Sequence, residues 1–315
     1  MKIENIFIGF SLADALGVPV EFKSRETLSQ DPVINMRSYG TYGQPAGTWS
    51  DDSSLAFCLA DSLCDGYNLK DIATKFVKWK LADNWTPHGQ VFDIGNQTRS
   101  AIYQLFNLLE KQDYDSLKLL KYDQDERTNG NGSLMRILPL LFYIKGKPIK
   151  EQFKFVWEIS ALTHPHIRSA IACLIYLKFA EFVYEGLSLK IAYTKMKKVI
   201  KTFFKESYIS DKEVALFDRI LVNDIYKLDE DEIYSDGYVL HTLEASLWCL
   251  LNTDSYLKSV LKAINLGEDT DTTATVVGGI AGMYYGLEEV PKEWINQLAK
   301  LEDIKELSQR FEKII

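Results

Sequence analysis

Apolar residues recur at helical spacing along most of the chain. In segments 69–81 and 165–183 they fall on one face of a helix. Segment 187–204 sets its apolar positions against many lysines, as in a helix whose outer face meets solvent. Few segments show the two-residue alternation typical of β-strands, and no glycine/serine-rich linker or internal repeat is visible. This pattern predicts an all-α fold, one compact multi-helix domain over residues 1–315. Further helices are expected at 97–110, 132–143, 150–162, 211–222, 241–251, 255–266 and near the C-terminus.

The apolar segment 274–286 is distinguished by three glycines inside a helical pattern. Each of Gly278, Gly279 and Gly282 costs about 1 kcal/mol of helix propensity relative to alanine. Such a cost is tolerated where neighbouring helices must approach closely, because glycine has no side chain. We therefore expect this segment to form the central buried helix of the fold.

Two short clusters of acids and hydroxyls each stand directly before an apolar helix. Serine, threonine and aspartate are preferred helix N-caps, so capping alone could explain either cluster. Capping needs one side chain, however, and these clusters offer several. Oxygen ligands without nearby cysteine or histidine favour Mg²⁺, Mn²⁺ or Ca²⁺ over Zn²⁺, and the calcium-loop pattern is absent. The candidate metal ligands are Ser50, Asp51 and Asp52 in the first cluster and Asp269, Asp271 and Thr272 in the second.

The number of carboxylates in these clusters suggests how many ions they hold. Four carboxylates in one small pocket would repel each other by several kcal/mol unless they were neutralised. Two divalent cations carry a charge of +4, which matches that count. The sequence therefore predicts two Mg²⁺ ions, with Mn²⁺ as an alternative, although some of the acids could lie outside the ligand shell or be protonated.

Composition narrows the classes of partner. The chain has 36 basic and 44 acidic residues, a formal net charge of −8. Phosphate binding needs a basic surface, so free nucleic acid is not expected as the main partner. Four cysteines without C-x-x-C spacing favour buried reduced thiols and a cytoplasmic location. No apolar run is expected to reach the roughly 18 residues of a membrane span, so no membrane partner is predicted.

Five motifs resemble those of the ADP-ribosylglycohydrolase family, in the family's order. Two are the acidic clusters: Ser50-Asp51-Asp52-Ser53 resembles T-D-D-T, and the run from Gly267 to Thr272 resembles G-G-D-T-D-T. The others are Ala13–Glu21 (family G-D-A-L-G-x-P-x-E), Asn131–Pro139 (N-G-[SA]-x-M-R-x-x-P) and Thr163-His164 followed by Ala170. The matches span residues 9–286. Departures are mild, but Glu268 replaces a family glycine and adds a negative charge beside the expected metal site.

This resemblance implies a function and a set of roles. The implied protein is a Mg²⁺-dependent hydrolase that cleaves the glycosidic bond at ribose C1″, releasing ADP-ribose from a modified protein, nucleic acid or small molecule. It implies that the two clusters ligate the metals and that Glu21, Asp52 and Asp269 are catalytic. Asp93 and Gly95 resemble the family's D-I-G element near the ligand, and Asp14 would support the site without touching the substrate.

The glycine-rich turn at 128–133 opens onto an expected helix. Backbone N–H groups in such a turn could receive a diphosphate, although Asn-Gly turns are common without a ligand. We expect ADP-ribose to be bound by Asn129, Gly130, Asn131, Ser133 and His164, together with Asp93 and Gly95.

Several alternatives remain open at this level. Glu21 could be an exposed loop carboxylate, Asp93 an ordinary cap and His164 a hydrogen-bonded core histidine. The chain could hydrolyse another ribosyl or phosphoryl substrate with the same metals. It could also be a non-catalytic binder, such as a crystallin-like or immunity-type protein. The acidic clusters argue against a non-catalytic binder, because a protein that had lost its activity would have no reason to retain four acids that are costly to bury.

Overall fold

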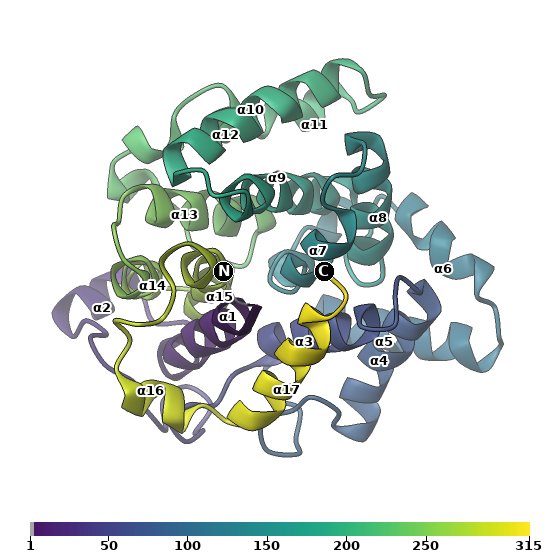
Figure 1. Cartoon of the computed structure of the whole chain (residues 1–315). Helices are drawn as coiled ribbons and strands as arrows, with labels where there is room; N and C mark the ends of the chain where they lie inside the picture. Colours follow the sequence, from purple (N-terminus) through teal and green to yellow (C-terminus); the bar gives the residue numbers. More distant parts are fainter. Residues whose placement is uncertain (1–2) are drawn as a thin grey trace.

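The computed structural model describes residues 3–315, and over that range it contains α-helices and 3₁₀ turns but no β-strand. The predicted all-α class and the single compact domain are confirmed, and the helices pack in layers (Figure 1). The longer helices are α1 (Ile3–Gly17), α3 (Asp51–Leu63), α4 (Leu69–Ala82), α5 (Asn96–Glu110), α8 (Ile149–Ala161), α9 (Ile167–Tyr184), α10 (Leu189–Lys205), α13 (Val239–Leu251), α14 (Tyr256–Asn265), α15 (Thr270–Tyr285) and α17 (Leu301–Glu312). The shorter ones are α2 (Arg25–Gln30), α6 (Asp115–Leu119), α7 (Leu141–Ile144), α11 (Asp211–Ala215), α12 (Asp218–Leu221) and α16 (Lys292–Gln297).

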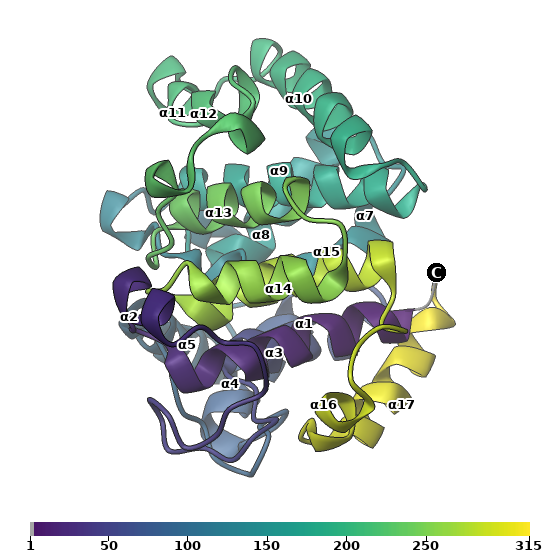
Figure 2. The same ribbon diagram turned by 90° about the vertical axis from the view of Figure 1, so that its left-hand side faces the viewer.

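Helices α1 and α15 form the centre of the molecule. Figure 2 shows α13 above them and α16 and α17 below, with α14 in front of α15 and with α9 and then α10 further out beyond α13. A Cβ atom at Gly278 would lie 2.5 Å from the carbonyl oxygen of Gly9, and one at Gly282 would lie 2.2 Å from that of Asn5. These glycines therefore let two backbones touch, and the expected central buried helix is confirmed. The contact also aligns the N-terminal end of α15 with the C-terminal end of α1.

The first helix is longer and more apolar than we expected from the sequence. By length and composition the stretch Ile3–Val20 could cross a membrane, with a mean hydropathy of 1.4, so the expectation that no run reaches this length is wrong. In the folded chain 89% of this stretch is buried among other helices. Burial on all sides explains its composition, because a helix surrounded by protein has no polar face.

Two expected helices are interrupted. Over 132–143 the chain forms two 3₁₀ turns, Asn131–Ser133 and Leu138–Leu140, followed by α7. Pro139 cannot donate a helical hydrogen bond, which favours a break at this point. The expected helix at 211–222 is divided into α11 and α12.

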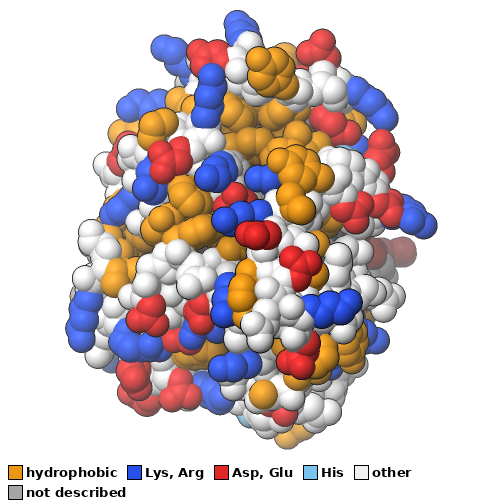
Figure 3. Space-filling view, turned by 90° about the vertical axis from the view of Figure 1, so that its right-hand side faces the viewer, with side chains coloured by type: hydrophobic (Ala, Val, Ile, Leu, Met, Phe, Trp, Pro, Cys, Tyr) orange, Lys and Arg blue, Asp and Glu red, His pale blue; other side chains and the backbone are white. Residues whose placement is uncertain are grey.

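The cysteines are free thiols, as expected: Cys58, Cys173 and Cys249 are buried and Cys64 is partly exposed. On the face shown in Figure 3, acidic and basic side chains are interspersed among apolar ones. Helix α10 presents most of its lysines to solvent, while its apolar side packs on α9.

Candidate active site

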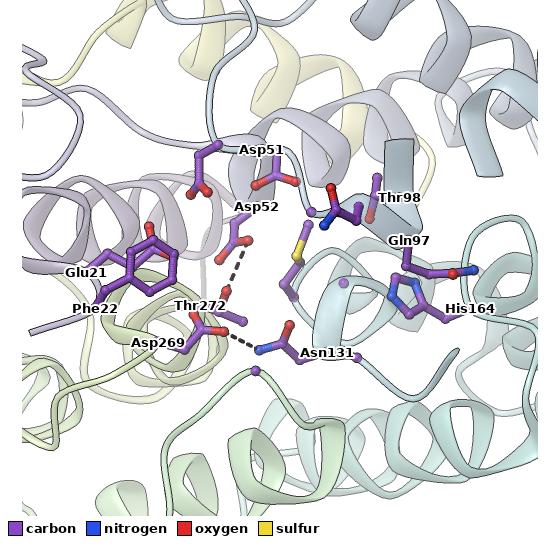
Figure 4. A pocket seen from close by; sticks show the side chains of 17 residues that line it. Glu21, Phe22, Asp51, Asp52, Gln97, Thr98, Asn131, His164, Asp269 and Thr272 are labelled. Carbon is purple, nitrogen blue, oxygen red and sulfur yellow. Dashed lines mark hydrogen bonds between the residues drawn. The ribbon is translucent and has the colours of Figure 1, made fainter. Parts of the chain in front are cut away.

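A cavity of about 270 Å³ lies where the two acidic clusters meet. Figure 4 shows Asp51 and Asp52 above Asp269 and Thr272, with Glu21 and Phe22 on one side and Gln97 and His164 on the other. The walls come from segments far apart in the sequence. The lining residues are Glu21, Phe22, Asp51, Asp52, Asp93, Gly95, Asn96, Gln97, Thr98, Gly130, Asn131, Gly132, Met135, His164, Gly237, Asp269 and Thr272.

The first cluster is held by α1. Ser50 is the N-cap of α3, and its Oγ accepts a hydrogen bond of 3.2 Å from the backbone N–H of Asp52. Asp14 of α1 accepts from the backbone N–H of Ser50 at 2.9 Å and from the hydroxyl of Ser53 at 2.5 Å. Asp14 therefore fixes the start of α3 from behind, the supporting role expected for it. Ser50 does not line the cavity, and its expected role as a metal ligand stays a prediction.

The second cluster meets the first through a hydroxyl. The Thr272 hydroxyl donates to Oδ1 of Asp52 at 3.3 Å across 220 positions of sequence. Asp269, at the N-cap of α15, receives a hydrogen bond of 2.8 Å on Oδ2 from the side-chain amide of Asn131. Asp271 is buried just behind the lining, and one of its carboxylate oxygens lies within 4.8 Å of oxygens from Glu21 and Asp93. The tertiary fold thus brings the two clusters together as the sequence predicted.

Three carboxylate oxygens at this meeting point have no hydrogen-bond donor among the described residues. They are Oε2 of Glu21, Oδ2 of Asp52 and Oδ1 of Asp269, and all three are buried. A buried carboxylate without a partner is strongly disfavoured. An all-oxygen set of this kind fits a hard divalent cation such as Mg²⁺ or Mn²⁺.

The electrostatics of the acids lead to the same ligand class. Burial, followed by repulsion from neighbouring carboxylates, raises the pKa of Asp51, Asp52 and Asp271 well above the ordinary value. Burial and then the charges of Asp93 and Asp269 raise the pKa of Glu21 to about 10. The raised pKa values mean that the cavity disfavours the ionised carboxylates in the absence of cations, and bound divalent ions would favour the ionised forms.

Glu21 and Asp93 face each other at the edge of the cluster. Glu21 follows the 3₁₀ turn Val18–Val20 and is buried, so it is not an exposed loop carboxylate. Asp93 has a left-handed φ of 47° and accepts a hydrogen bond of 2.5 Å on Oδ1 from the hydroxyl of Tyr42. Tyr42 was not predicted, because the glycine-bearing loop 38–48 carries no motif that marks one residue.

The glycine-rich turn forms the opposite wall. Gly130, Asn131 and Gly132 line the cavity beside His164. A Cβ atom at Gly132 would lie 2.6 Å from Cε1 of His164, so the ring occupies the space that a side chain would need. Burial, with a smaller contribution from Arg136, lowers the pKa of His164 to about 3, so its imidazole is neutral.

Two expected substrate contacts lie elsewhere. Oδ1 of Asn129 accepts a hydrogen bond of 3.3 Å from the Ser169 hydroxyl of α9, and its amide donates to the carbonyl of Glu126. Ser133 is buried with its hydroxyl 3.6 Å from the sulfur of Cys173. Neither side chain lines the cavity, and their expected contact with ADP-ribose stays a prediction. The motif spacing could not show this, because both side chains contact residues of α9, which is distant in the sequence.

Arg136 supports this wall and was missed as a functional residue, although it stands within the Asn131–Pro139 motif. It is fully buried, and its Nη1 donates to the carbonyl of Gly132. Its Nη2 lies 3.4 Å from the carbonyl oxygen of Ile159 near the end of α8, and the guanidinium rests on Phe76 at 4.9 Å from the ring centre. Arg136 therefore joins the glycine-rich turn to the helix that precedes His164.

The chain belongs to the ADP-ribosylglycohydrolase family, whose sequence profile matches residues 2–315. It is an enzyme of this family and thus a hydrolase of glycosidic bonds to ADP-ribose. It is 30% identical to the ADP-ribosylarginine hydrolase Tri1 of Serratia proteamaculans, over 98% of this chain and 78% of that protein. It is 24% identical to the ADP-ribosyl-[dinitrogen reductase] glycohydrolase of Rhodospirillum rubrum, over 93% and 88%. A solved structure of an ADP-ribosylglycohydrolase-related protein complex superposes with a TM-score of 0.76 at 26% identity, covering 99% and 97%.

Proposed function

We propose that this protein is a hydrolase that removes ADP-ribose from modified arginine side chains and depends on two Mg²⁺ or Mn²⁺ ions. The observation that carries the proposal is the set of buried, donor-free carboxylate oxygens of Glu21, Asp52 and Asp269 in one cavity. The arginine acceptor is supported by the relative from Serratia proteamaculans, which is named as an ADP-ribosylarginine hydrolase and aligns with 98% of this chain.

The cavity offers separate places for the parts of the substrate. The metal ions, held by Asp51, Asp52, Asp269, Asp271 and Thr272, would bind the ribose hydroxyls and lower the pKa of a water molecule. The backbone around Gly130 and Gly132 would receive the diphosphate, because the glycines leave the N–H groups open to an anion.

The reaction follows from these placements. Water attacks ribose C1″ as the bond to the acceptor nitrogen breaks through an oxocarbenium-like state. Glu21 or a cluster aspartate takes a proton from the water and returns it to the acceptor nitrogen, which leaves with the electron pair of the broken bond. The surrounding carboxylates stabilise the positive charge that develops on the ribose.

Hydrolysis of a peptide carrying ADP-ribosylarginine tests the proposal. We expect release of free ADP-ribose, loss of turnover in excess chelator and recovery with Mg²⁺ or Mn²⁺. In heavy-oxygen water the label should appear at C1″ of ADP-ribose and not on the acceptor. Full turnover after verified metal removal would exclude the metal-dependent reaction, and cleavage of serine-linked but not arginine-linked ADP-ribose would exclude the arginine acceptor.

The Asp269→Asn variant tests the ligand set. The amide should still accept the hydrogen bond from Asn131 while losing the charge that a metal requires. We expect most activity and metal binding to disappear with little change in circular dichroism. Unchanged turnover in this variant would remove Asp269 from the ligand set.

A further inference from the structure

An exposed phenyl ring stands at the mouth of the acidic cavity. Phe22 directly follows Glu21, lines the cavity and is 66% exposed. In Figure 4 the ring lies beside Glu21, across the acidic cluster from His164 and Gln97. If the diphosphate lies on the glycine-rich turn beside His164, the acceptor half of the substrate extends towards Phe22.

The backbone holds Phe22 in a conformation that residues other than glycine rarely adopt. Its φ is 64°, and its N–H donates to the carbonyl of Glu268 at 2.7 Å. Glu268 has a φ of 60° and donates its own N–H to the carbonyl of Lys23 at 2.8 Å. These paired hydrogen bonds fix the ring at the cavity mouth, where it gains little from burial.

Phe22 is one of three aromatic residues that we call the aromatic rim: Phe22, Tyr42 and Phe92. The rings of Phe22 and Tyr42 lie edge to face with their centres 6.5 Å apart, and those of Tyr42 and Phe92 are 5.4 Å apart. The Tyr42 hydroxyl donates to Asp93, so the rim is tied directly to a carboxylate of the cavity. An aromatic face and carboxylates therefore stand side by side.

A planar cation complements an aromatic face beside carboxylates better than a neutral group does. A guanidinium stacks on aromatic faces while its N–H groups donate to carboxylates. The residues that line the cavity include five acids and neither lysine nor arginine, so no basic side chain of the lining competes for this place. A serine-linked substrate has a neutral oxygen at the same point and gains nothing from the ring's electrostatics.

We propose that Phe22 is a specificity-determining residue whose ring stacks on the guanidinium of the arginine acceptor, with the Asp93 carboxylate beside it. This inference rests on the proposed function, because it assumes that the acceptor is arginine.

The test compares Phe22→Leu, Phe22→Tyr and Tyr39→Leu with the unaltered protein. Leucine keeps an apolar side chain but removes the aromatic face, whereas tyrosine keeps the face. Tyr39 is the matched control, because it is also an exposed aromatic residue with a positive φ, of 54°, but does not line the cavity. The measurements are kcat/KM on a peptide carrying ADP-ribosylarginine and Kd for free ADP-ribose, which has no acceptor.

We expect Phe22→Leu to lower kcat/KM by about 3- to 10-fold, with Kd for ADP-ribose unchanged. Phe22→Tyr should retain more of the original kcat/KM than Phe22→Leu, and Tyr39→Leu should retain all of it. The inference is overturned if Phe22→Leu keeps full kcat/KM, or if it loses ADP-ribose affinity by the same factor as kcat/KM. It is also overturned if Tyr39→Leu shows the same loss, which would indicate a general effect on the loops. An unaltered protein that does not cleave the arginine-linked peptide would instead refute the proposed function, and this inference with it.

Discussion

The side-chain amide of Asn131 donates a hydrogen bond of 2.8 Å to the carboxylate of Asp269, joining residues 138 positions apart. The same amide nitrogen donates to the hydroxyl of Thr242 at 2.9 Å. Asn131 belongs to the glycine-rich turn, and Asp269 belongs to the proposed metal cluster. The contact therefore couples the expected diphosphate wall to the expected metal site.

The Asn131→Ala variant should weaken the binding of divalent metal ions in the cavity. A hydrogen bond to a charged group contributes about 1.5–3 kcal/mol, so we expect divalent-metal affinity to fall roughly 10- to 100-fold. Calorimetry with Mg²⁺ or Mn²⁺ measures this loss. Thr242→Val removes the other acceptor of the same amide and leaves the bond to Asp269, so its effect on metal affinity should be smaller. Equal losses in the two variants would contradict the coupling.

Stability of the metal-free protein should fall as pH rises. Burial raises the pKa of Asp14 to about 7 from an ordinary value of 3.8. The folded chain thus binds this proton more tightly than the unfolded chain, so the contribution of Asp14 to stability is greatest below about pH 4 and declines as pH rises towards 7. The raised pKa values of Asp51, Asp52 and Asp271 act in the same direction.

Thermal unfolding in chelator at roughly pH 5 and pH 8 measures this dependence. We expect a lower Tm at the higher pH, and recovery when Mg²⁺ is added, because the ion binds the ionised carboxylates of the folded state. Asp14→Asn should reduce the slope. A metal-free Tm that rises with pH over this interval would show that the acids are not protonated in the folded protein.

Gly132→Ala should weaken ADP-ribose binding. The added Cβ would lie 2.6 Å from Cε1 of His164 and 3.1 Å from the Thr98 hydroxyl, so the histidine must move out of the wall. Gly95→Ala is the contrast, because a Cβ there meets nothing within 4 Å. We expect Gly95→Ala to preserve the fold, and any loss of ADP-ribose affinity in it would place the ligand against that residue. Unchanged affinity in a folded Gly132→Ala variant would argue against the turn as the diphosphate site.

We expect Glu268 to affect the stability of the fold more than the affinity for metal ions. Its side chain is exposed and lies in an adjoining hollow with Arg25 and Asp236, outside the acidic cavity. Glu268→Gly should raise the free energy of unfolding by up to about 1 kcal/mol, because relief of a left-handed backbone that costs about 1–2 kcal/mol outweighs the extra entropy that glycine gives the unfolded chain. Chemical denaturation measures this change. Glu268→Gln keeps the strain and removes the charge, and we expect it to leave Mg²⁺ affinity within about twofold, since exposed charges are screened.

The sequence by itself determined the helical class, the central helix and the family. Helical periodicity is a local property of the sequence. The glycines of 274–286 indicate a close contact with a neighbouring helix, whichever helix that is. The clusters around Asp52 and Asp269 could be recognised because buried helix starts rarely carry so many acids. Their juxtaposition was inferred from charge and chemistry, and the Thr272–Asp52 hydrogen bond now joins them.

Only the tertiary structure decided which side chains of each motif face the cavity. Asn131 lines it and Asn129 does not, although both flank the same glycine, because a 3₁₀ turn and the contact with α9 set their directions. Phe22, Tyr42 and Arg136 had no periodic signal, since their positions depend on hydrogen bonds to carbonyls or carboxylates 23 or more positions away in the chain. Such contacts depend on how distant segments pack together, so the local spacing of residues does not predict them.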